Sequence, residues 1–388
     1  MKTPTAAAVR RIPLHVPSVG RAEADAAADA VLSGRLVGRG PIGAALEDRI
    51  AADLKVKHAL LTTSGSHALE LAAASLKIGR GDEVIMPSFT FSSVANAVMR
   101  QGAKPVFAEV KLDDLNLDPE DVARRITKKT KAIVAVHYAG VASDMEALLR
   151  LCRKHGLALI EDAAHSVGAK WRGRPLGTIG DAGCYSFHST KNITCGEGGA
   201  FFTNSNSVAE RAEWFREKGT NRSAFLRGEV RKYDWVSEGS SFVLSDVLAA
   251  VLAVQWGKIA AINAERGRLY ALYQDALRDL DARGLLRLPR FAKDCEPSWH
   301  LFHILLPTRR ERDRVMDAMK ADGVGATFHY QPLHASPFGK KVLGWKEPMP
   351  LSERAGATLL RLPLYDGLTT EDARYVCGSL RRALTGAR

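Results

Sequence analysis

The sequence predicts an α/β fold with a mostly parallel sheet, helices on both faces and a small α+β domain at the C-terminus. From residue 58 onward, short apolar runs alternate with helical stretches, as is typical of a parallel sheet covered on both sides. The expected strands are 58–61, 83–86, 105–107, 132–136 and 157–160, separated by helices at 67–77, 92–101, 118–125 and 144–154. After turn-forming residues at 289–297, the pattern changes to a strand near 299–306 and helices near 310–321, 352–360 and 370–384.

Four further helical segments decide the domain boundaries. Helices at 21–33 and 42–53, joined by a glycine-rich loop, come before the alternating region, and a helix at 207–218 follows it. A long, interrupted helix at 244–280 leads out of that region. We therefore expect a large domain over residues 1–255, with an N-terminal helical segment, and a small domain over 256–388 that includes the long connecting helix.

Composition excludes several classes of protein. The 388 residues, 46% of them hydrophobic, suffice for a large core. No apolar run reaches membrane-spanning length, and the first eleven residues lack the apolar core of a signal peptide, so we expect a cytoplasmic protein that binds no membrane. Five cysteines without a CxxC pair favour neither a disulfide framework nor a metal site. The net charge of +12 is spread along the chain without a DNA-binding motif, so we expect no nucleic acid partner.

The motif that carries chemistry is a lysine between a polar run and a glycine-rich turn. Lys191 follows a strand-like run that ends near Ser186, and glycines follow at 196, 198 and 199. Taken alone, Lys191 is more typical of a surface loop than of a buried site. However, Glu161-Asp162-Ala163-Ala164-His165 also follows an apolar run. A carboxylate there can keep a pyridine nitrogen protonated, and a desolvated lysine can form a Schiff base, which together point to pyridoxal phosphate (PLP) chemistry.

A phosphate site is predicted at the turn that opens the helix at 67–77. Ser64-Gly65-Ser66 offers small hydroxyl groups, backbone N–H groups and the positive end of a helix. Such a turn is too generic to name a ligand alone. In open α/β sheets, ligands bind beyond the carboxyl ends of the strands. The turn at 87–91, Asp162 and Ser186–Lys191 all follow strands, so we expect them to face one site.

With these motifs in order, the chain resembles the DegT/DnrJ/EryC1/StrS sugar aminotransferases of the fold type I PLP enzymes, from about residue 13 to 384. The resemblance implies a seven-stranded, mostly parallel sheet and PLP in the large domain. The motifs that carry it are Thr63-Ser64-Gly65-Ser66-His67-Ala68-Leu69, Pro87-Ser88-Phe89-Thr90-Phe91, Glu161-Asp162-Ala163-Ala164-His165 and Ser186-Phe187-His188 with Lys191 and Gly196-Glu197-Gly198-Gly199.

The resemblance also implies roles for individual residues. Lys191 would hold the cofactor covalently and shuttle a proton, and Asp162 would pair with the pyridine nitrogen. His165 would contact the cofactor's 3-hydroxyl, unless it is a packing histidine. Further cofactor contacts are implied for Ser64, Gly65, Ser66, Phe91, which would stack on the ring, and Ser186. Many relatives have an Asn-Tyr-Arg sequence where this chain has Ser241-Phe242-Val243, so Ser241 would reach the neighbouring subunit's phosphate in a homodimer with shared sites.

The expected reaction is transfer of an amino group from L-glutamate to the 4-keto carbon of a dTDP-linked 6-deoxy sugar. The motifs at 189–192, 233–241 and 328–334 resemble a subgroup with that activity. We expect Arg222, Arg227, His329 and Tyr330 to bind the substrate; solvated arginines and a packed histidine are the alternative. A 4-keto pentose or a 3-keto nucleotide sugar also fits. An amino-acid aminotransferase, a sugar dehydratase, which Lys191 disfavours, and a non-catalytic regulator of the same fold are the remaining readings.

Overall fold

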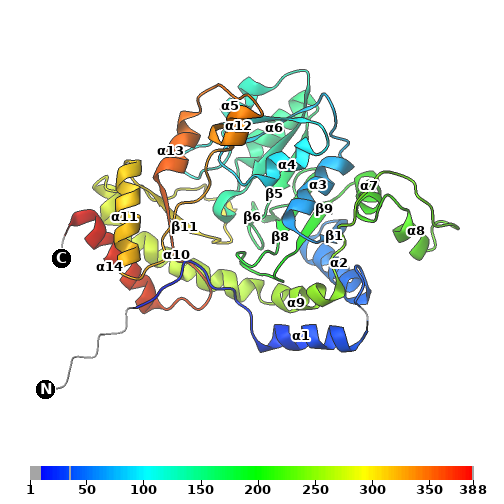
Figure 1. Cartoon of the computed structure of the whole chain (residues 1–388), viewed down its shortest axis with the longest axis horizontal. Coiled ribbons are helices and arrows are strands. Elements are labelled where there is room, and N and C mark those ends of the chain that lie inside the picture. The colour runs from blue at the N-terminus through cyan, green and yellow to red at the C-terminus, as the bar shows by residue number, and fades with distance from the viewer. Residues whose placement is uncertain (1–9, 35, 387–388) are drawn as a thin grey trace.

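The computed structural model of the chain describes residues 10–34 and 36–386, so the predicted lack of a signal peptide at the N-terminus falls largely outside it. Its centre is a seven-stranded sheet with the strand order β1-β9-β8-β5-β4-β2-β3 (Figure 1). The strands are β1 (His58–Thr62), β2 (Glu83–Pro87), β3 (Lys104–Ala108), β4 (Thr130–Val136), β5 (Ala158–Asp162), β8 (Ala182–Ser186) and β9 (Gly199–Thr203). The predicted α/β class and mostly parallel sheet are confirmed.

Strand β9 is the antiparallel member of this sheet, and it sets two loops against each other. It pairs with β1 on one side and β8 on the other, so Gly199 lies opposite both Thr62 and Ser186. A side chain at Gly199 would meet the backbone oxygen of Ser64 at 2.4 Å. Glycine is therefore required for the loop after β1 to lie close to the end of β8.

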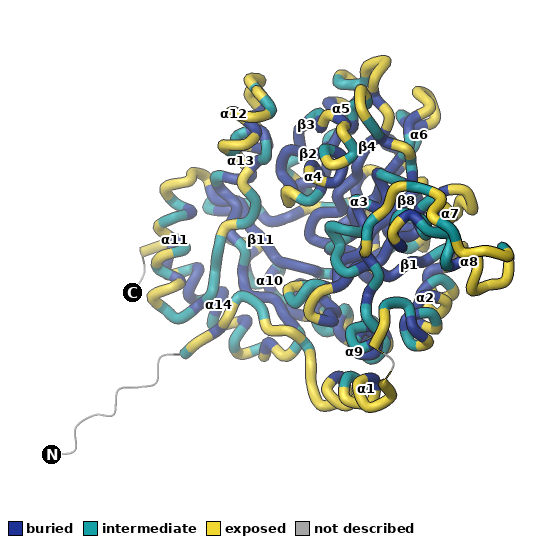
Figure 2. Tube along the Cα trace, turned by 45° about the vertical axis from the view of Figure 1, so that its right-hand side comes forward, coloured by how far each residue is buried: buried dark blue, intermediate teal, exposed yellow. Residues whose placement is uncertain are grey.

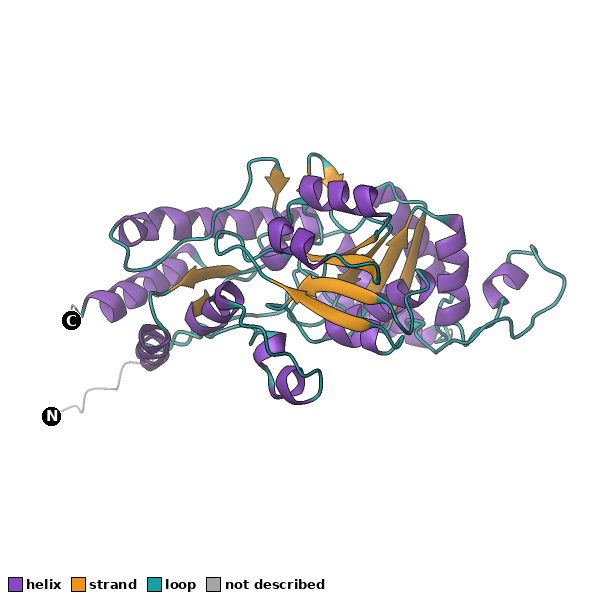
Figure 3. Ribbon diagram, turned by 90° about the horizontal axis from the view of Figure 1, so that it is seen from above, coloured by secondary structure: helices purple, strands orange, loops and turns teal. Residues whose placement is uncertain are grey.

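Helices cover both faces of the sheet (Figure 3). Alternate strand residues point to opposite faces, so Leu60 and Phe201 pack in one apolar cluster while Leu61 and Phe202 pack in another. The first face is covered by α3 (Gly65–Ser75), α4 (Ser93–Met99) and α7 (Asn206–Arg216). The second face is covered by α2 (Pro41–Leu54), α5 (Pro119–Arg125), α6 (Met145–His155) and α9 (Asp246–Trp256).

The long predicted helix is two helices. α9 ends at Trp256 and α10 (Ile259–Ala282) begins after a break, with a bend of 57°. In the part of the chain that is described, no individual helix is both long and apolar enough to span a membrane; α9 and α10 reach that length and composition only when counted together as a bent pair.

α10 leads to a C-terminal unit with an apolar cluster of its own. The unit contains the antiparallel pair β11 (Phe302–Leu305) and β12 (Leu359–Leu362). Its helices are α11 (Arg309–Ala321), α12 (Pro337–Lys341), α13 (Pro350–Thr358) and α14 (Thr370–Thr385), with the short 3₁₀ turn η2 (Leu333–Ala335).

The N-terminal segment joins this unit to the large sheet. Residues 10–20 run past α10 before α1 (Arg21–Leu32) packs along α9 (Figure 1). On the way, Ile12 exchanges backbone hydrogen bonds with Gly323 and Gly325. His15 Nε2 then lies 2.9 Å from the carbonyl oxygen of Ser189, in the loop that carries Lys191.

Some elements differ from the prediction. The helix expected at 352–360 ends at Thr358, because Leu359–Leu362 pairs with β11 and becomes a strand. A small sheet of β6 (Lys170–Trp171), β7 (Arg174–Pro175) and β10 (Cys295–Glu296) was not expected, nor were the 3₁₀ turn η1 (Tyr138–Gly140) and the short helix α8 (Arg222–Leu226). These pieces are too short to leave a periodic pattern in the sequence.

Candidate active site

The carboxyl ends of the parallel strands β1, β2, β4, β5 and β8, or the loops that follow them, border a cavity of about 510 Å³. Ser64, Phe91, Asp162 and Ser186 each lie at the end of a strand or in the loop after it. The structure brings most of the predicted site residues to this cavity: Ser64, Gly65, Ser66, Phe91, Asp162, His165, Ser186, Lys191, His329 and Tyr330.

Asp162 is the last residue of β5, and its carboxylate faces the cavity without an ion pair to any residue that the structure describes. The side chain is buried and accepts one hydrogen bond, from the Ala164 N–H at 3.0 Å. Burial raises the pKa of Asp162, while the Ala164 N–H and the nearby Lys191 lower it in part. A buried carboxylate in this state gains stability when a cation binds beside it.

Lys191 enters the same cavity from the loop after β8. The loop folds back on itself, since the Lys191 N–H bonds to the His188 carbonyl and the Ser189 N–H bonds to the Gly196 carbonyl. Burial lowers the pKa of the Lys191 amine to about 8; Asp162 opposes this shift and Arg361 adds to it. A lysine with this pKa is neutral in an appreciable fraction near pH 7, as a nucleophilic amine has to be.

The predicted phosphate site lies at the N-terminus of α3. Ser64 is the N-cap, with its Oγ accepting from the His67 N–H at 3.1 Å, and Gly65 begins the helix. A Cβ on Gly65 would lie 2.8 Å from the Cβ of Ser186, so glycine allows β8 to close the site from the side. The hydroxyl groups of Ser66 and Ser93, 2.6 Å apart, complete a small polar cup that suits a phosphate.

Aromatic and imidazole rings form the wall opposite this cup. The Tyr330 hydroxyl lies 3.2 Å from His165 Nε2, and His300 stacks on His165 at a ring separation of 4.2 Å. Burial holds the pKa of His165 well below its usual value, so the ring is neutral. Its Nδ1 is buried and has no hydrogen-bond partner among the described residues. Phe91, 57% exposed, offers a free ring face at the cavity mouth.

His329 is partly buried and makes two contacts with neighbouring rings. Its Nδ1 lies 2.7 Å from the Tyr138 hydroxyl, and its ring stacks on Tyr330 at 3.7 Å. Burial and nearby positive charge lower the pKa of His329 to about 2, so this side chain is neutral as well. It can orient a polar ligand as a neutral hydrogen-bonding group only.

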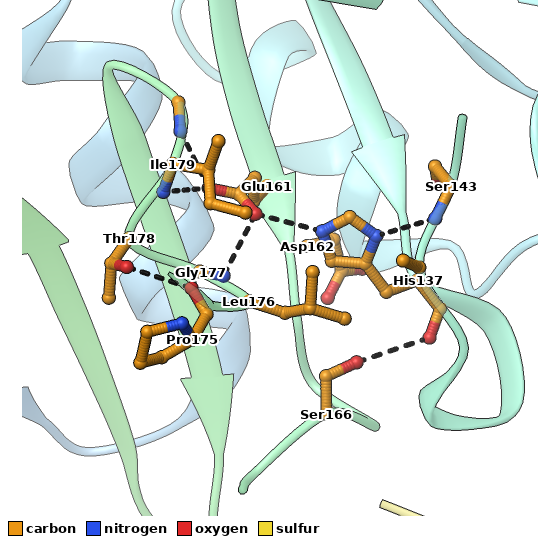
Figure 4. A network of polar contacts seen from close by, with 12 residues as sticks. His137, Ser143, Glu161, Asp162, Ser166, Pro175, Leu176, Gly177, Thr178 and Ile179 are labelled. Atoms are coloured by element: carbon orange, nitrogen blue, oxygen red, sulfur yellow. Dashed lines mark hydrogen bonds and ion pairs between the residues drawn. The ribbon is translucent and has the colours of Figure 1, made fainter. Parts of the chain in front are cut away.

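A second buried carboxylate anchors the strand that carries Asp162 (Figure 4). Glu161 points to the opposite face of the sheet, where it accepts backbone N–H bonds from Gly177, Ile179 and Gly180 and contacts His137 Nε2 at 2.9 Å. Burial raises the pKa of Glu161, but the hydrogen bonds from His137 and the backbone N–H groups outweigh burial and lower this pKa. The end of β5 is thereby fixed between two loops.

Three predicted residues lie away from the cavity of their own chain. Arg222 pairs with Glu217, and Arg227 pairs with Glu213 and Glu229. Ser241 is exposed and forms a backbone bridge with Glu217. All three belong to the segment 219–243, which includes α8 and projects from the body at the edge far from the C-terminal unit (Figure 1); much of this segment is exposed (Figure 2).

The sequence analysis missed several cavity residues, among them Ser93 of the polar cup and His15, Thr90, His300 and Arg361. Thr90 belongs to the motif at 87–91, but no feature of that motif indicates that the Thr90 hydroxyl is buried without a hydrogen-bond partner among the described residues. His15 and Arg361 reach the cavity through the N-terminal segment and β12. Their place depends on long-range packing that no local pattern records.

Comparisons with known proteins agree with this geometry. Residues 18–381 match the DegT/DnrJ/EryC1/StrS aminotransferase family. The uncharacterized protein MJ1066 of Methanocaldococcus jannaschii is 31% identical over 384 residues, 97% of this chain and 98% of the relative. DesV from S. venezuelae, solved in complex with a ketimine intermediate, is 33% identical with a TM-score of 0.86, covering 97% of this chain and 100% of DesV. The aminotransferase TlmJ from Streptoalloteichus hindustanus is 30% identical with a TM-score of 0.89 over the same shares.

The fold, the cavity and these matches define the class: an aminotransferase that depends on PLP. The chain belongs to the DegT/DnrJ/EryC1/StrS family, and it is a sugar aminotransferase.

The cavity fits this cofactor. Within the described part of the chain, Asp162 is a buried carboxylate without an ion pair, as a protonated ring nitrogen requires, and His165 Nδ1 is a buried polar atom without a hydrogen-bond partner. At the start of α3, the backbone N–H groups of the Gly65 turn and the hydroxyl groups of Ser66 and Ser93 offer donors to a phosphate. Lys191 supplies an amine with a lowered pKa in the same cavity.

The lowered pKa of Lys191 can be tested without the cofactor. In cofactor-free protein, the rate at which an amine-arylating reagent modifies Lys191 should rise with pH and level off above about 8, because the neutral amine reacts and is then fully formed. Peptide mass spectrometry follows this lysine, and the Lys191→Arg variant supplies the background from the others. A rate that keeps rising to pH 10, as for an ordinary lysine, would show that burial does not shift this group.

Proposed function

We propose that this protein transfers an amino group from L-glutamate to the 4-keto carbon of a dTDP-4-keto-6-deoxy sugar, as a dTDP-4-amino-4,6-dideoxygalactose transaminase does. The observation that carries the proposal is the pairing of Lys191 and Asp162 in one cavity, with His329 and Tyr330 of the C-terminal unit on its wall. The sugar assignment rests on the resemblance of the motifs at 189–192, 233–241 and 328–334.

Each catalytic residue has a distinct task. When bound, PLP withdraws electrons from the carbon of an attached amine and so makes that carbon acidic. The Asp162 carboxylate holds the positive charge on the ring nitrogen that this requires. Lys191 Nζ takes the proton from the α-carbon of the donor, and in the second half-reaction it returns a proton to the sugar's C4. The lowered pKa of Lys191 suits both directions of transfer near neutral pH.

The remaining cavity residues hold and orient. The backbone N–H groups at the start of α3, with Ser66 and Ser186, bind the phosphate, and Ser64 caps that helix. His165 and Tyr330 form a hydrogen-bonded pair that faces the ring's hydroxyl. Phe91 covers one ring face and excludes water from it.

We further propose that two copies of the chain share their sites. The segment 219–243 exposes apolar side chains, among them Trp235 at 80% exposure, with Phe225, Leu226, Tyr233 and Val236. Such a patch favours a protein partner. In a second subunit's site, Arg222 and Arg227 would meet the sugar's pyrophosphate, and Ser241 would meet the phosphate of PLP.

The proposal also assigns a role to each domain. Residues 1–255 act as the domain that holds PLP, and residues 256–388 act as the small domain that closes over the substrate.

Sedimentation tests the shared site. We expect a dimer at working concentration, and Trp235→Asp, which places a charge in the exposed apolar patch, should yield monomers that lose turnover with the loss of the partner's residues. The exposed Leu351→Asp on α13 serves as the control and should remain dimeric. A monomer with full activity would contradict the proposal.

The reaction itself is tested with purified enzyme, L-glutamate and dTDP-4-keto-6-deoxyglucose. We expect mass spectrometry and NMR to find an amine at C4 of the sugar and 2-oxoglutarate as coproduct. Lys191→Ala should lower turnover by at least about 10²-fold, because no other group moves the proton. Amination of a 4-keto pentose or a 3-keto sugar with no turnover of the hexose would replace the substrate, and glutamate consumption without any amination would refute the sugar assignment.

A further inference from the structure

One histidine reaches the active-site cavity from the N-terminal segment, which runs between the C-terminal unit and the large sheet (Figure 1). Leu14 and His15 of this segment line the cavity. Just before the histidine, the Leu14 carbonyl accepts a hydrogen bond from the Leu364 N–H at 3.4 Å. Just after it, the Ser18 carbonyl accepts from the Gln255 side chain at 2.6 Å. The main chain at His15 is therefore held by contacts with both parts of the molecule.

The ring of His15 donates a hydrogen bond at one nitrogen and can accept one at the other. Its Nε2 lies 2.9 Å from the carbonyl oxygen of Ser189, and a carbonyl oxygen only accepts, so Nε2 carries a proton. Burial lowers the pKa of His15 by more than the bond to Ser189 raises it, and the positive charges of Arg361 and Arg266 lower it further. The ring is therefore neutral near pH 7, and its Nδ1 keeps a free lone pair.

This lone pair is left for a ligand. His15 Nδ1 forms no hydrogen bond with any residue that the structure describes, and the ring is only partly buried where it lines the cavity. An acceptor in that position is satisfied by a group that donates a hydrogen bond. The question is which substrate of the enzyme brings such a donor.

The chemistry of the two substrates answers it. The carboxylates of an amino-acid donor accept hydrogen bonds only, so the lone pair of Nδ1 repels them. The ammonium group of the amino acid does donate, but its nitrogen is the one that is transferred and has to meet Lys191. A keto sugar carries hydroxyl groups, which donate. His15 therefore complements the sugar and not the amino acid.

The position of His15 favours one hydroxyl of that sugar. The ring is bonded to Ser189, two residues before Lys191 in the same loop, and the Lys191 amine acts at C4 of the proposed substrate. In a 4-keto-6-deoxyhexose, the hydroxyl next to C4 is the one on C3, whereas the hydroxyl on C2 lies one carbon farther away. The C3 hydroxyl is thus the donor nearest to the loop that His15 contacts.

We propose that His15 Nδ1 accepts a hydrogen bond from the C3 hydroxyl of the keto sugar and thereby makes the enzyme specific for sugars that carry this group. This inference deepens the proposed function and rests on it for the 4-keto sugar. A site that pairs a substrate hydroxyl rejects analogues without it more strongly than an apolar pocket does, because the polar group of the protein is then left unpaired.

Two variants separate the acceptor from the contact with Ser189. His15→Gln can place an amide N–H where the Nε2–H lies, but it has no polar atom at the position of Nδ1; His15→Asn has the reverse properties. In the reaction of the aminated enzyme with dTDP-4-keto-6-deoxyglucose, His15→Gln should raise the KM for the sugar at least about fivefold, as the loss of one neutral hydrogen bond does. His15→Asn should recover most of this loss. Val16→Gln, at the next and exposed position of the segment, is the matched control and should behave as wild type.

The half-reaction with L-glutamate is the internal reference. PLP-loaded enzyme is titrated with glutamate without sugar, and the loss of the visible absorbance gives the apparent Kd. This Kd should be the same for wild type and His15→Gln, because glutamate has no hydroxyl group for the acceptor. Equal damage to both half-reactions would show that His15 only supports the loop of Lys191, and the inference would be overturned.

Substrate analogues identify the hydroxyl. dTDP-4-keto-3,6-dideoxyglucose lacks the C3 hydroxyl, so wild type and His15→Gln should have equal KM values for it. The 2,6-dideoxy analogue keeps the C3 hydroxyl, and the difference between the two proteins should persist. A difference that remains without the C3 hydroxyl, or that vanishes without the C2 hydroxyl, would overturn the assignment.

A binding measurement separates this inference from the proposed function. dTDP-6-deoxyglucose has no keto group and cannot be aminated, but it carries the C3 hydroxyl. It should raise the melting temperature of PLP-loaded wild type more than dTDP does, and His15→Gln should remove most of this additional rise. If the difference is present while the enzyme aminates another keto sugar or none, the proposed substrate fails and the His15 site stands. If the additional rise is the same in both proteins, the inference is overturned.

Discussion

A carboxylate buried at the end of β5 without a cation of its own is the constraint on which the site depends. Ionising Asp162 in this buried position costs free energy, and a cation bound beside it would offset that cost. The preceding residue fixes the position of Asp162, because Glu161 accepts hydrogen bonds from three backbone N–H groups and contacts His137. The strand alternation that sends Glu161 into the protein sends Asp162 into the cavity.

Other buried polar groups around the cavity also lack hydrogen-bond partners. His165 Nδ1, Thr90 Oγ1 and the Arg361 Nε are all buried without partners among the described residues, whereas most interior polar groups of globular proteins are paired. Lys191, with a pKa of about 8, is a cation weakened by burial. Groups of both charges are thus held ready for a ligand that is itself cationic at one end and anionic at others, as a PLP–amino acid pair is.

The local sequence predicts the fold and those site residues that lie at strand ends and in the turns after them. Alternating apolar runs gave the sheet, and short motifs after β1, β5 and β8 placed Gly65, Asp162 and Lys191 at one edge, because parallel strands end together. Arg361 escaped prediction, since the sequence predicts a helix up to residue 360 and no strand after it, and the partner strand β11 lies more than fifty residues away. Arg222 and Arg227 were expected near the cofactor, but their ion pairs with Glu217 and Glu213 lie outside this chain's cavity; a motif shows that charge is present but not what it faces.

The central claim is that Lys191 is the residue that carries PLP. Reduction of the holoenzyme with borohydride, followed by protease digestion and mass spectrometry, locates the attachment directly. The account predicts a pyridoxyl group on the peptide that contains Lys191, and loss of this adduct when glutamate is added before reduction. A pyridoxyl group on a different lysine, or none on a protein that has bound stoichiometric PLP, would contradict it.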